Sequence, residues 1–474
     1  MFSISLPPSR RRSGAAGRAL SFLVITAAIA VSHPVLAQER SPWSVRSVLG
    51  APEPLRVSGS FRTRYEAIDG QTRPGFEPES DLVSLRTTLF AEYDFGAVRL
   101  GGELYDSRAY GAGALTPVST SEINTAELVQ AYVAVDLDEP LGPGTRATVQ
   151  AGRFMLNLGS RRLVAADDYR NTTNGYTGLR ADLSLPSGIR TTIVYTMPQA
   201  RLPDDLPSLL DNRGRVDRAT DDVVLWGGVV SKADLFAGAT VEASYFRFDE
   251  QDAPGRPTRD RALDTVSLRL IRDPRPGAVD YEVEVIRQTG SVSAGLGPAA
   301  ARLDVSAGFV HAEAGVSLET AWSPRLSAEF DYASGDDGDP AFGRFDTLFG
   351  MRRAELAPSG LYNVVGRANI LTPGLRIEAS PNARVDLFLA GRLLWLASDT
   401  DSFSTTGVRD AAGRSGDFAG RQLDGRVRWW IVPAALRLEL NGVWLSKADF
   451  LKAAPNAPRT GDSRYLSLNL TALF

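Results

Sequence analysis

Arginine is the residue type in this sequence with the most evident chemistry, since only three of the 52 basic residues are lysines: Lys232, Lys447 and Lys452. A guanidinium group keeps its charge and makes planar, bidentate contacts with carboxylates and phosphates. Arg62 and Arg64 stand two residues apart in one apolar–polar run. Such spacing puts both side chains on one face of a β-strand. The pattern favours attraction of an anionic solute by rows of guanidinium groups, although a bias of genome composition would also enrich arginine over lysine.

Other chemistries have few residues available to them. The chain contains no cysteine, which excludes disulfides and thiolate metal sites. Of the two histidines, His33 lies near the N-terminus, and His311 has no recognisable Ser or Asp motif around it. We therefore predict no catalytic residue, no cofactor and no metal. A net charge of −4 gives no basic character overall, so nucleic acid is not an expected partner.

The elements that must position the arginines are β-strands. In the last one, Leu466, Leu468, Leu470 and Ala472 alternate with polar residues, and the chain ends on an aromatic residue, Phe474. Comparable alternation recurs along the whole chain, with charged residues on the polar face. A water-filled lumen tolerates such a face, and a packed soluble core does not. The pattern predicts an all-β fold, a transmembrane antiparallel β-barrel whose first and last strands pair.

The chain divides into three parts. Residues 1–37 have a basic start, an apolar segment too short to span a bilayer and small residues at 35–37, so we expect a cleaved signal peptide. Residues 38–55 are a short periplasmic lead-in, and residues 56–474 form the barrel. The expected location is the outer membrane of a Gram-negative bacterium, with outer-membrane lipid and lipopolysaccharide around the barrel and the barrel-assembly machinery as a partner during biogenesis.

We predict eighteen strands, enough for an aqueous channel, with short turns at one end of the barrel and long loops at the other. Residues 301–321 read as one long strand, whereas residues 361–371 and 374–380 read as two strands joined by a tight turn at Pro373-Gly374. The long polar segment 335–360 is expected to be a loop that folds outward or into the lumen.

Two stretches carry a resemblance to a known family. The first runs from Gly152-Arg153-Phe154 through Arg161-Arg162 to Tyr169-Arg170-Asn171, and the second from Tyr332 through Gly335-Asp336 to Phe345-Asp346. Together with the strand spacing they resemble the alginate-export family of outer-membrane barrels over about residues 56–474. Two departures concern the solute: Tyr176-Thr177-Gly178 replaces an expected Phe-Asp-Gly, and a histidine that commonly follows the second motif is absent. The resemblance implies diffusion of an anionic polysaccharide, or another anionic solute, through an arginine-lined pore.

The candidate site residues form two sets. Strand parity turns one set of arginines toward the lumen, namely Arg62, Arg64, Arg86, Arg180, Arg367, Arg392, Arg426, Arg428 and Arg437. The family motifs supply a second set, namely Arg153, Arg161, Arg162, Arg170, Asn171, Gly335, Asp336, Phe345 and Asp346. Inward carboxylates such as Glu66 and Asp386 offer an alternative in which cross-strand ion pairs neutralise the wall.

Two further points stay open at this level. Arg153 shares the outward parity of Val149 and Ala151, so a bulge at Gly152 is needed to turn it inward. The acidic residues Asp336, Asp337 and Asp339 have the oxygen ligands that a divalent cation prefers, but the simpler expectation is a solvated acidic loop.

The predicted function is a passive channel for an alginate-like polyuronate, as polymer or oligomer, or for another anionic solute. The alternative is a general or small-anion porin unrelated to alginate. An outer-membrane enzyme or a purely structural barrel is less favoured, because no nucleophile–base motif accompanies His311.

Overall fold

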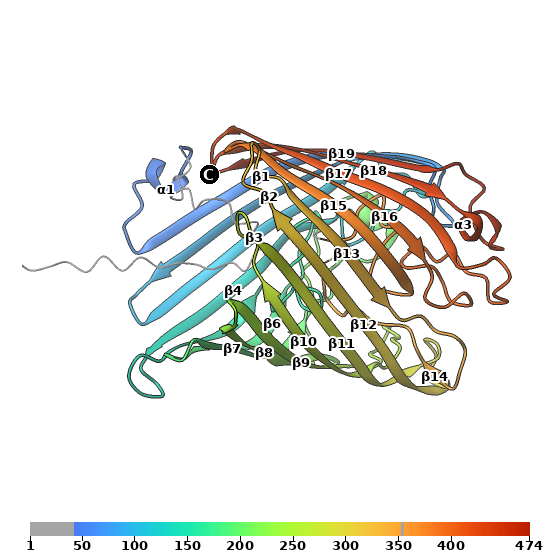
Figure 1. The fold of residues 1–474 in the computed structure, drawn as a ribbon. Helices are drawn as coiled ribbons and strands as arrows, with labels where there is room; N and C mark the ends of the chain where they lie inside the picture. Colours follow the sequence, from blue (N-terminus) through green and yellow to red (C-terminus); the bar gives the residue numbers. More distant parts are fainter. Residues whose placement is uncertain (1–41, 352–354) are drawn as a thin grey trace, which may run out of the picture.

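Alternating apolar and polar residues give this chain long antiparallel strands, which wind round a common axis (Figure 1). The computed structural model describes residues 42–351 and 355–474; the predicted signal peptide (1–37) lies outside them. The first strands are β1 Leu55–Asp69, β2 Glu79–Asp94, β3 Val98–Tyr110, β4 Asn124–Asp138, β5 Arg146–Phe154, β6 Tyr176–Ser184, β7 Ile189–Pro198, β8 Val223–Phe236 and β9 Ala239–Glu250. The others are β10 Ala262–Arg272, β11 Val279–Ser293, β12 Arg302–Ser317, β13 Arg325–Ala333, β14 Ala341–Phe342, β15 Ile370–Asn382, β16 Val385–Trp395, β17 Phe418–Val432, β18 Leu436–Lys447 and β19 Ser463–Leu473.

The sheet closes on itself. Each long strand pairs antiparallel with the next, and β1 pairs with β19 from Ser60 opposite Leu473 to Asp69 opposite Arg464. The two-residue β14 lies outside this round, because it pairs in parallel with β12 while β13 pairs directly with β15. The predicted all-β, antiparallel barrel of eighteen strands is therefore confirmed. Closure matters because a free edge would leave unpaired amides in a bilayer.

The described residues include three short helices, none of which forms part of the barrel wall: α1 Val45–Val48, α2 Leu206–Leu210 and α3 Asp449–Ala453. Helix α1 and the C-terminus lie at the end with short turns, and α3 lies among the long loops at the opposite end (Figure 1). No helix in the described ranges is long and apolar enough to cross a bilayer.

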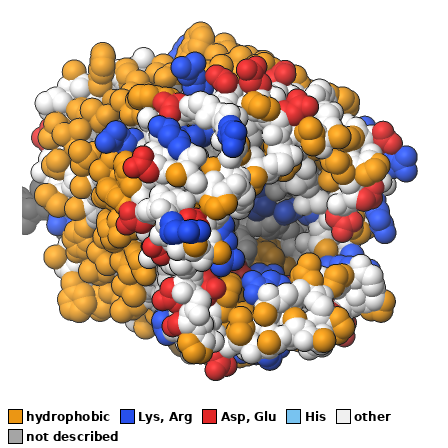
Figure 2. All heavy atoms as spheres, turned by 90° about the vertical axis from the view of Figure 1, so that its right-hand side faces the viewer, with side chains coloured by type: hydrophobic (Ala, Val, Ile, Leu, Met, Phe, Trp, Pro, Cys, Tyr) orange, Lys and Arg blue, Asp and Glu red, His pale blue; other side chains and the backbone are white. Residues whose placement is uncertain are grey.

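Side chains sort between the two faces of the wall every second residue. On β1, Phe61 and Tyr65 are each 41% exposed on the outside, whereas Arg62, Arg64 and Glu66 are buried on the lumen side. The outer wall is largely apolar, as Figure 2 shows beside the end of the barrel that carries the long loops. The inner wall carries charged side chains. Because many of them are buried although they face the lumen, other parts of the protein must fill part of the lumen.

Two loops provide that filling. The β5–β6 loop (residues 155–175) and the β14–β15 loop (described over residues 343–351 and 355–369) meet inside the barrel, where the amide of Phe349 donates to the carbonyl of Leu163 over 2.9 Å. A Cβ atom on Gly350 would lie 1.8 Å from the carbonyl oxygen of Arg162, so glycine permits this close approach. Apolar residues of both loops, Leu163 and Leu361 among them, are completely or almost completely buried.

Two expectations about the strands differ from the structure. Residues 301–321 do contain one strand, but the predicted strand 361–371 is wrong, because residues 361–369 belong to the β14–β15 loop. Val364 and Val365 are apolar because they are buried inside the lumen, not because they face lipid. The predicted turn at Pro373-Gly374 is also wrong: both residues lie within β15, where Pro373 is opposite Phe330.

A charge placed on the outer wall should destabilise the barrel in a bilayer. Leu389 lies near the middle of β16 and is 48% exposed. We expect Leu389→Arg to lower the free energy of unfolding in lipid vesicles by about 2–4 kcal/mol, because the guanidinium must enter hydrocarbon. Leu296→Arg, in the β11–β12 loop, is the control and should change stability by less than about 0.5 kcal/mol. Equal effects of the two substitutions in denaturant titrations would contradict the assignment of faces.

Candidate solute pathway

Three of the predicted pore arginines hold the β5–β6 loop in place. Arg62 donates to the carbonyl of Arg170 over 2.8 Å, and Arg64 donates to the carbonyl of Tyr169 over 2.6 Å. Arg86 reaches the same Arg170 carbonyl over 3.2 Å. Carbonyl oxygens accept well from guanidinium groups, and hydrogen bonds with one charged partner are the stronger kind. These side chains therefore fix a loop across the lumen.

A second group of charges joins the two loops to each other and to the wall. Arg162 of the β5–β6 loop is 1% exposed and lies 2.5 Å from Glu284 on β11 and 2.5 Å from Glu355 of the β14–β15 loop. It also pairs with Glu282, beside Glu284 on the same strand. Arg367 pairs with the remaining oxygen of Glu355. The three guanidinium-bound carboxylates thus tie both loops to β11.

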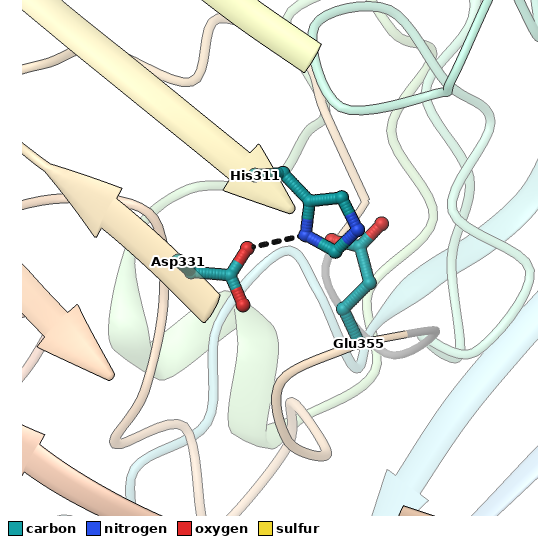
Figure 3. A group of neighbouring side chains, drawn as sticks. All are labelled: His311, Asp331 and Glu355. Atoms are coloured by element: carbon teal, nitrogen blue, oxygen red, sulfur yellow. Dashed lines mark hydrogen bonds and ion pairs between the residues drawn. The ribbon is translucent and has the colours of Figure 1, made fainter. Parts of the chain in front are cut away.

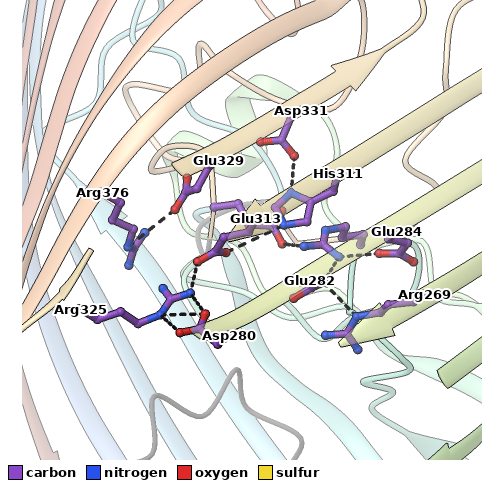
Figure 4. A network of polar contacts seen from close by, with 12 residues as sticks. Arg269, Asp280, Glu282, Glu284, His311, Glu313, Arg325, Glu329, Asp331 and Arg376 are labelled. Atoms are coloured by element: carbon purple, nitrogen blue, oxygen red, sulfur yellow. Dashed lines mark hydrogen bonds and ion pairs between the residues drawn. The ribbon is translucent and has the colours of Figure 1, made fainter. Parts of the chain in front are cut away.

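The same cluster continues toward β12, β13 and β16. His311 on β12 and Asp331 on β13 are fully buried, with 2.8 Å between His311 Nδ1 and Asp331 Oδ1 (Figure 3). Arg392 on β16 pairs with Glu329 and lies 3.5 Å from Asp331. Figure 4 shows how the carboxylates and guanidinium groups alternate along this part of the wall. Arg392, like Arg367, is therefore part of a buried ionic cluster.

The remaining predicted pore arginines lie on the wall beside carboxylates or aromatic rings. Arg180 is 2.7 Å from Asp182, Arg426 and Arg428 are each 2.9 Å from Asp386, and the Arg437 guanidinium lies 5.4 Å from the centre of the Trp430 ring. For Arg426 and Arg428 of β17, which pair with Asp386 of β16, the structure contains the cross-strand pairing weighed from the sequence, whereas Arg180 pairs with a carboxylate of its own strand, β6. Nearby carboxylates therefore offset part of the positive charge of these three arginines, of which Arg426 and Arg428 share Asp386.

Arg153 turns toward the inner side without the bulge that the sequence required. The pairings of β5 with β4 and β6 run through Gly152 with no register shift, and Gly152 instead adopts a φ of +124°. The Arg153 side chain reaches Glu127 over 2.5 Å and the carbonyl of Asp217 over 2.8 Å. The expected bulge is therefore wrong, because an unusual glycine conformation redirects the strand.

The other residues of the family motifs hold loops together. In the first motif Arg161 pairs with Asp168, Arg170 pairs with Asp167, and the Asn171 amide donates to the carbonyls of Leu85, Arg108 and Glu122. In the second, Gly335 packs on the Asn369 side chain, Asp336 accepts from the Gly343 amide, Phe345 stacks on Phe309 and Asp346 pairs with Arg261. Within the described ranges Asp336, Asp337 and Asp339 do not converge as metal ligands.

A cavity of about 550 Å³ lies between the two lumen loops and the neighbouring long loops. Among the described residues, five arginines line it, namely Arg170, Arg201, Arg259, Arg344 and Arg367, together with the aromatic rings of Phe342, Phe345 and Phe349. Figure 2, which looks onto the end with the long loops, shows a hollow with basic side chains around it. The cavity therefore combines positive charge with flat apolar surfaces.

Two of these arginines have no carboxylate partner among the described residues. Arg201 donates to the Asn174 side chain over 2.6 Å, and Arg259 donates to the carbonyl of Ser293 over 2.8 Å while lying over the Phe342 ring. Burial, followed by the nearby positive charge of Arg170, lowers the pKa of Arg201 to about 10. A buried guanidinium without a counter-ion favours an anion beside it.

Sequence reasoning missed Arg201, Arg259 and Arg344. All three lie in loops, where alternation carries no information about the direction of a side chain. Arg344 directly precedes the Phe345-Asp346 motif, so that motif was the one available signal for it. Arg201 and Arg259 have no neighbouring pattern that distinguishes them from other loop arginines.

Removing Arg62 should loosen the β5–β6 loop. We expect Arg62→Gln to lower the free energy of unfolding by about 1–3 kcal/mol, because the carbonyls at 168–170 lose a charged donor. Limited proteolysis within residues 160–172 should become faster. The matched control Arg180→Gln disrupts a partly exposed ion pair within β6 and should leave this proteolysis unchanged. Identical cleavage rates in the Arg62→Gln variant and the parent would contradict the role of Arg62 in holding the β5–β6 loop.

Glu122 should make the β3–β4 loop (residues 111–123) sensitive to pH. Burial, followed by the charge of Glu66, raises the pKa of Glu122 to about 7. A raised carboxyl pKa favours the folded state at low pH, and this contribution is lost as pH rises from the unfolded-state pKa to about 7. Glu122→Gln should therefore stabilise the protein at pH 8, by about 1–3 kcal/mol, and leave it unchanged at pH 4. Chemical denaturation at both pH values checks the sign.

Comparison with known proteins agrees with this architecture. OccAB1 of Acinetobacter baumannii matches with a TM-score of 0.56 and 14% identity, over 92% of this chain and 99% of that one. OccD3 (OpdP) of Pseudomonas aeruginosa matches with a TM-score of 0.55 and 11% identity, over 89% and 91%. The outer membrane protein opdK of Pseudomonas aeruginosa matches at 0.54 and 10%, over 88% and 99%. At such low identity the likeness concerns the fold.

No curated protein sequence matches the chain. The model of the alginate export family, by contrast, matches residues 53–464, nearly the entire barrel. Family and fold together place the barrel in the outer membrane of a Gram-negative bacterium, as an outer-membrane channel. The chain belongs to the alginate export family.

Proposed function

We propose that this outer-membrane channel passes an anionic saccharide, an alginate-like polyuronate or its oligomers, by passive diffusion. The observation that carries the proposal is the cavity between the lumen loops, where Arg201 and Arg259 have no carboxylate partner among the described residues. The alginate export family supplies the class of solute. Export and uptake are equally compatible with passive diffusion.

The cavity suits a carboxylated sugar for two reasons. A guanidinium can bind each carboxylate through paired hydrogen bonds, and the rings of Phe342, Phe345 and Phe349 offer flat surfaces to the apolar faces of sugar rings. Asp167 and Asp346 also line the cavity and temper its positive charge. Attraction that is real but limited lets a solute enter and leave, which conduction requires.

The arginines proposed from strand parity take a supporting part in this function. Arg62, Arg64 and Arg86 hold the β5–β6 loop, which forms one side of the cavity, and Arg367 both lines the cavity and binds Glu355. We propose that Arg180, Arg426, Arg428 and Arg437, on the wall beyond the cavity, give a weaker basic lining.

A small-anion porin is the main alternative, and the same cavity would serve it through charge alone. An enzyme is disfavoured by family and fold, and His311, fully buried within ion pairs, has no exposed face for a substrate. As partners other than the solute, we propose lipid and lipopolysaccharide around the apolar wall, and the barrel-assembly machinery during insertion.

Planar-bilayer recordings test the proposed solute. We expect an anion-selective conductance that uronate oligomers block, and a double variant Arg201→Gln, Arg259→Gln in which the blocking affinity falls at least about tenfold, because two charge-assisted contacts are lost. The control Arg213→Gln removes an exposed, ion-paired arginine from the same loop as Arg201, and uronate oligomers should block this variant with the same affinity as the parent.

Three other outcomes are informative. If small organic anions such as acetate block the conductance as strongly as uronates do, the small-anion porin is favoured. A cation-selective channel that ignores uronates would remove the substrate proposal. An intact, heat-modifiable barrel without conductance would favour a structural barrel.

A further inference from the structure

His311 occupies an unusual position in the lumen. It is fully buried on β12 and is the single histidine in the described part of the chain. Its Nδ1 atom is 2.8 Å from Asp331 Oδ1, and its Nε2 atom lies 4.0 Å from Glu313 Oε2 with no hydrogen-bond partner (Figures 3 and 4). Ligand atoms of His311, Asp331 and Glu355 all lie within 4.8 Å of one another. Both ring nitrogens therefore face carboxylates.

Charged groups surround the ring from every element packed on it. The carboxylates are Glu282 and Glu284 of β11, Glu313 of β12, Glu329 and Asp331 of β13, and Glu355 of the β14–β15 loop. The guanidinium groups among them are Arg162 and Arg367 of the two lumen loops and Arg392 of β16. Arg269, Arg325 and Arg376 join from the outer side of the cluster and bring Glu242, Asp280 and Glu378 with them. Among these described residues, carboxylates outnumber guanidinium groups.

A protonated imidazole fits this arrangement. A neutral ring would donate one N–H to Asp331 and leave the Nε2 lone pair buried against Glu313 and Glu355, which is unfavourable. A second proton turns Nε2 into a donor and adds a positive charge where carboxylates are in excess. Asp331 also fixes the orientation of the ring, so the charge is directed toward the loop.

We propose that His311 is a proton-operated latch for the lumen loops: protonated, it helps to hold Glu355 and the β14–β15 loop in the barrel, and deprotonated, it lets them leave. This regulation rests on the proposed channel function. The β14–β15 loop supplies Phe345, Phe349 and Arg367 to the cavity wall. Its release widens the pathway and removes part of the solute-binding surface.

A divalent metal ion suits the cluster less well than a proton. Glu355 accepts from Arg162 and Arg367 through its two oxygens, and Arg392 lies 3.5 Å from Asp331. A dication bound by His311, Asp331 and Glu355 would therefore lie among three guanidinium groups, and repulsion at these short distances in a buried site is large.

The latch has a defined direction with pH. Protons favour the latched state, so the unlatched fraction rises with pH. If the ring binds its proton tenfold more tightly in the latched state, the ratio of unlatched to latched molecules changes about tenfold across the titration. Two loop carboxyls must be controlled for when pH is varied, because burial raises the pKa of Glu122 to about 7 and that of Asp217 to about 6.

Bilayer recordings between pH 5 and pH 8 test the latch in the full-length mature barrel. We expect mean conductance to rise with pH in the parent and in the control variant Glu122→Gln, Asp217→Asn, which removes the other two titrating groups. His311→Gln should be high-conducting and insensitive to pH, because glutamine can still donate to Asp331 but carries no charge. Glu355→Gln, which removes the charge on the loop instead, should also shift conductance upward at pH 5.

A labelling experiment reports the loop directly, since the chain has no cysteine of its own. Ser359 is 3% exposed in the β14–β15 loop, whereas Asp337 is exposed. We expect the maleimide reaction rate of Ser359→Cys, divided by that of Asp337→Cys at the same pH, to rise about tenfold from pH 5 to pH 8. In the His311→Gln background this ratio should be high at both pH values.

Several results would overturn the latch. One is a pH response of conductance that persists in the His311→Gln variant, and another is a pH response that is lost in the control variant Glu122→Gln, Asp217→Asn. A third is a ratio of maleimide reaction rates for Ser359→Cys that does not change with pH. Conductance of the parent that shifts with zinc or with a chelator, but not in His311→Gln, would establish a metal site in its place. If uronates do not block the channel but its conductance still depends on pH, the proposed solute is wrong and the latch is retained. Heat-modifiability on gels shows for each variant that the barrel has folded.

Discussion

The constraint on which the structure depends is that a bilayer offers no hydrogen-bond partner to a backbone amide. The β1–β19 ladder meets it by closing the round of strands, and every other feature follows from that closure. A closed wall of this size encloses a wide lumen, and strand alternation fills the inner face with polar and charged side chains. Charged groups on that face need water, counter-charges or loop carbonyls. The two lumen loops supply the last two.

Most arginines of the inner wall therefore bind loop carbonyls or carboxylates. Arg62 and Arg64 bind the β5–β6 loop, and Arg392 binds Glu329 within the ionic cluster. A row of guanidinium groups read from strand parity is thus mainly a scaffold. Among the described arginines that line the cavity, Arg201 and Arg259 have no carboxylate partner, and we propose that these two attract the solute most strongly. On this proposal, selectivity depends on few residues, which the other arginines hold in position through the loops.

The sequence predicted the wall well and the lumen poorly, for a physical reason. Alternation is imposed by the lipid–water boundary, so it identified the closing strand ending at Phe474 and the inward position of Arg62. Loops inside the lumen obey no such period. Val364 and Val365 were read as a strand because buried apolar residues look the same whether they face lipid or a core. The partners of Arg162 lie 120 or more residues away, and no local pattern announces them.

Because ion pairs attach the loops, the loops are held in one arrangement against the wall, which apolar packing alone would not achieve. Removing one partner from a buried ion pair leaves an unpaired charge and costs about 3–5 kcal/mol, whereas apolar contacts weaken gradually. The loops do share apolar contacts, through residues such as Leu163 and Leu361, and these favour association without fixing one orientation. The pairs of Arg162 with Glu284 and Glu355 select one arrangement of loop against wall. Because that arrangement is held by charge, its stability responds to protonation and to anions, and both are present in the solution that passes through the channel.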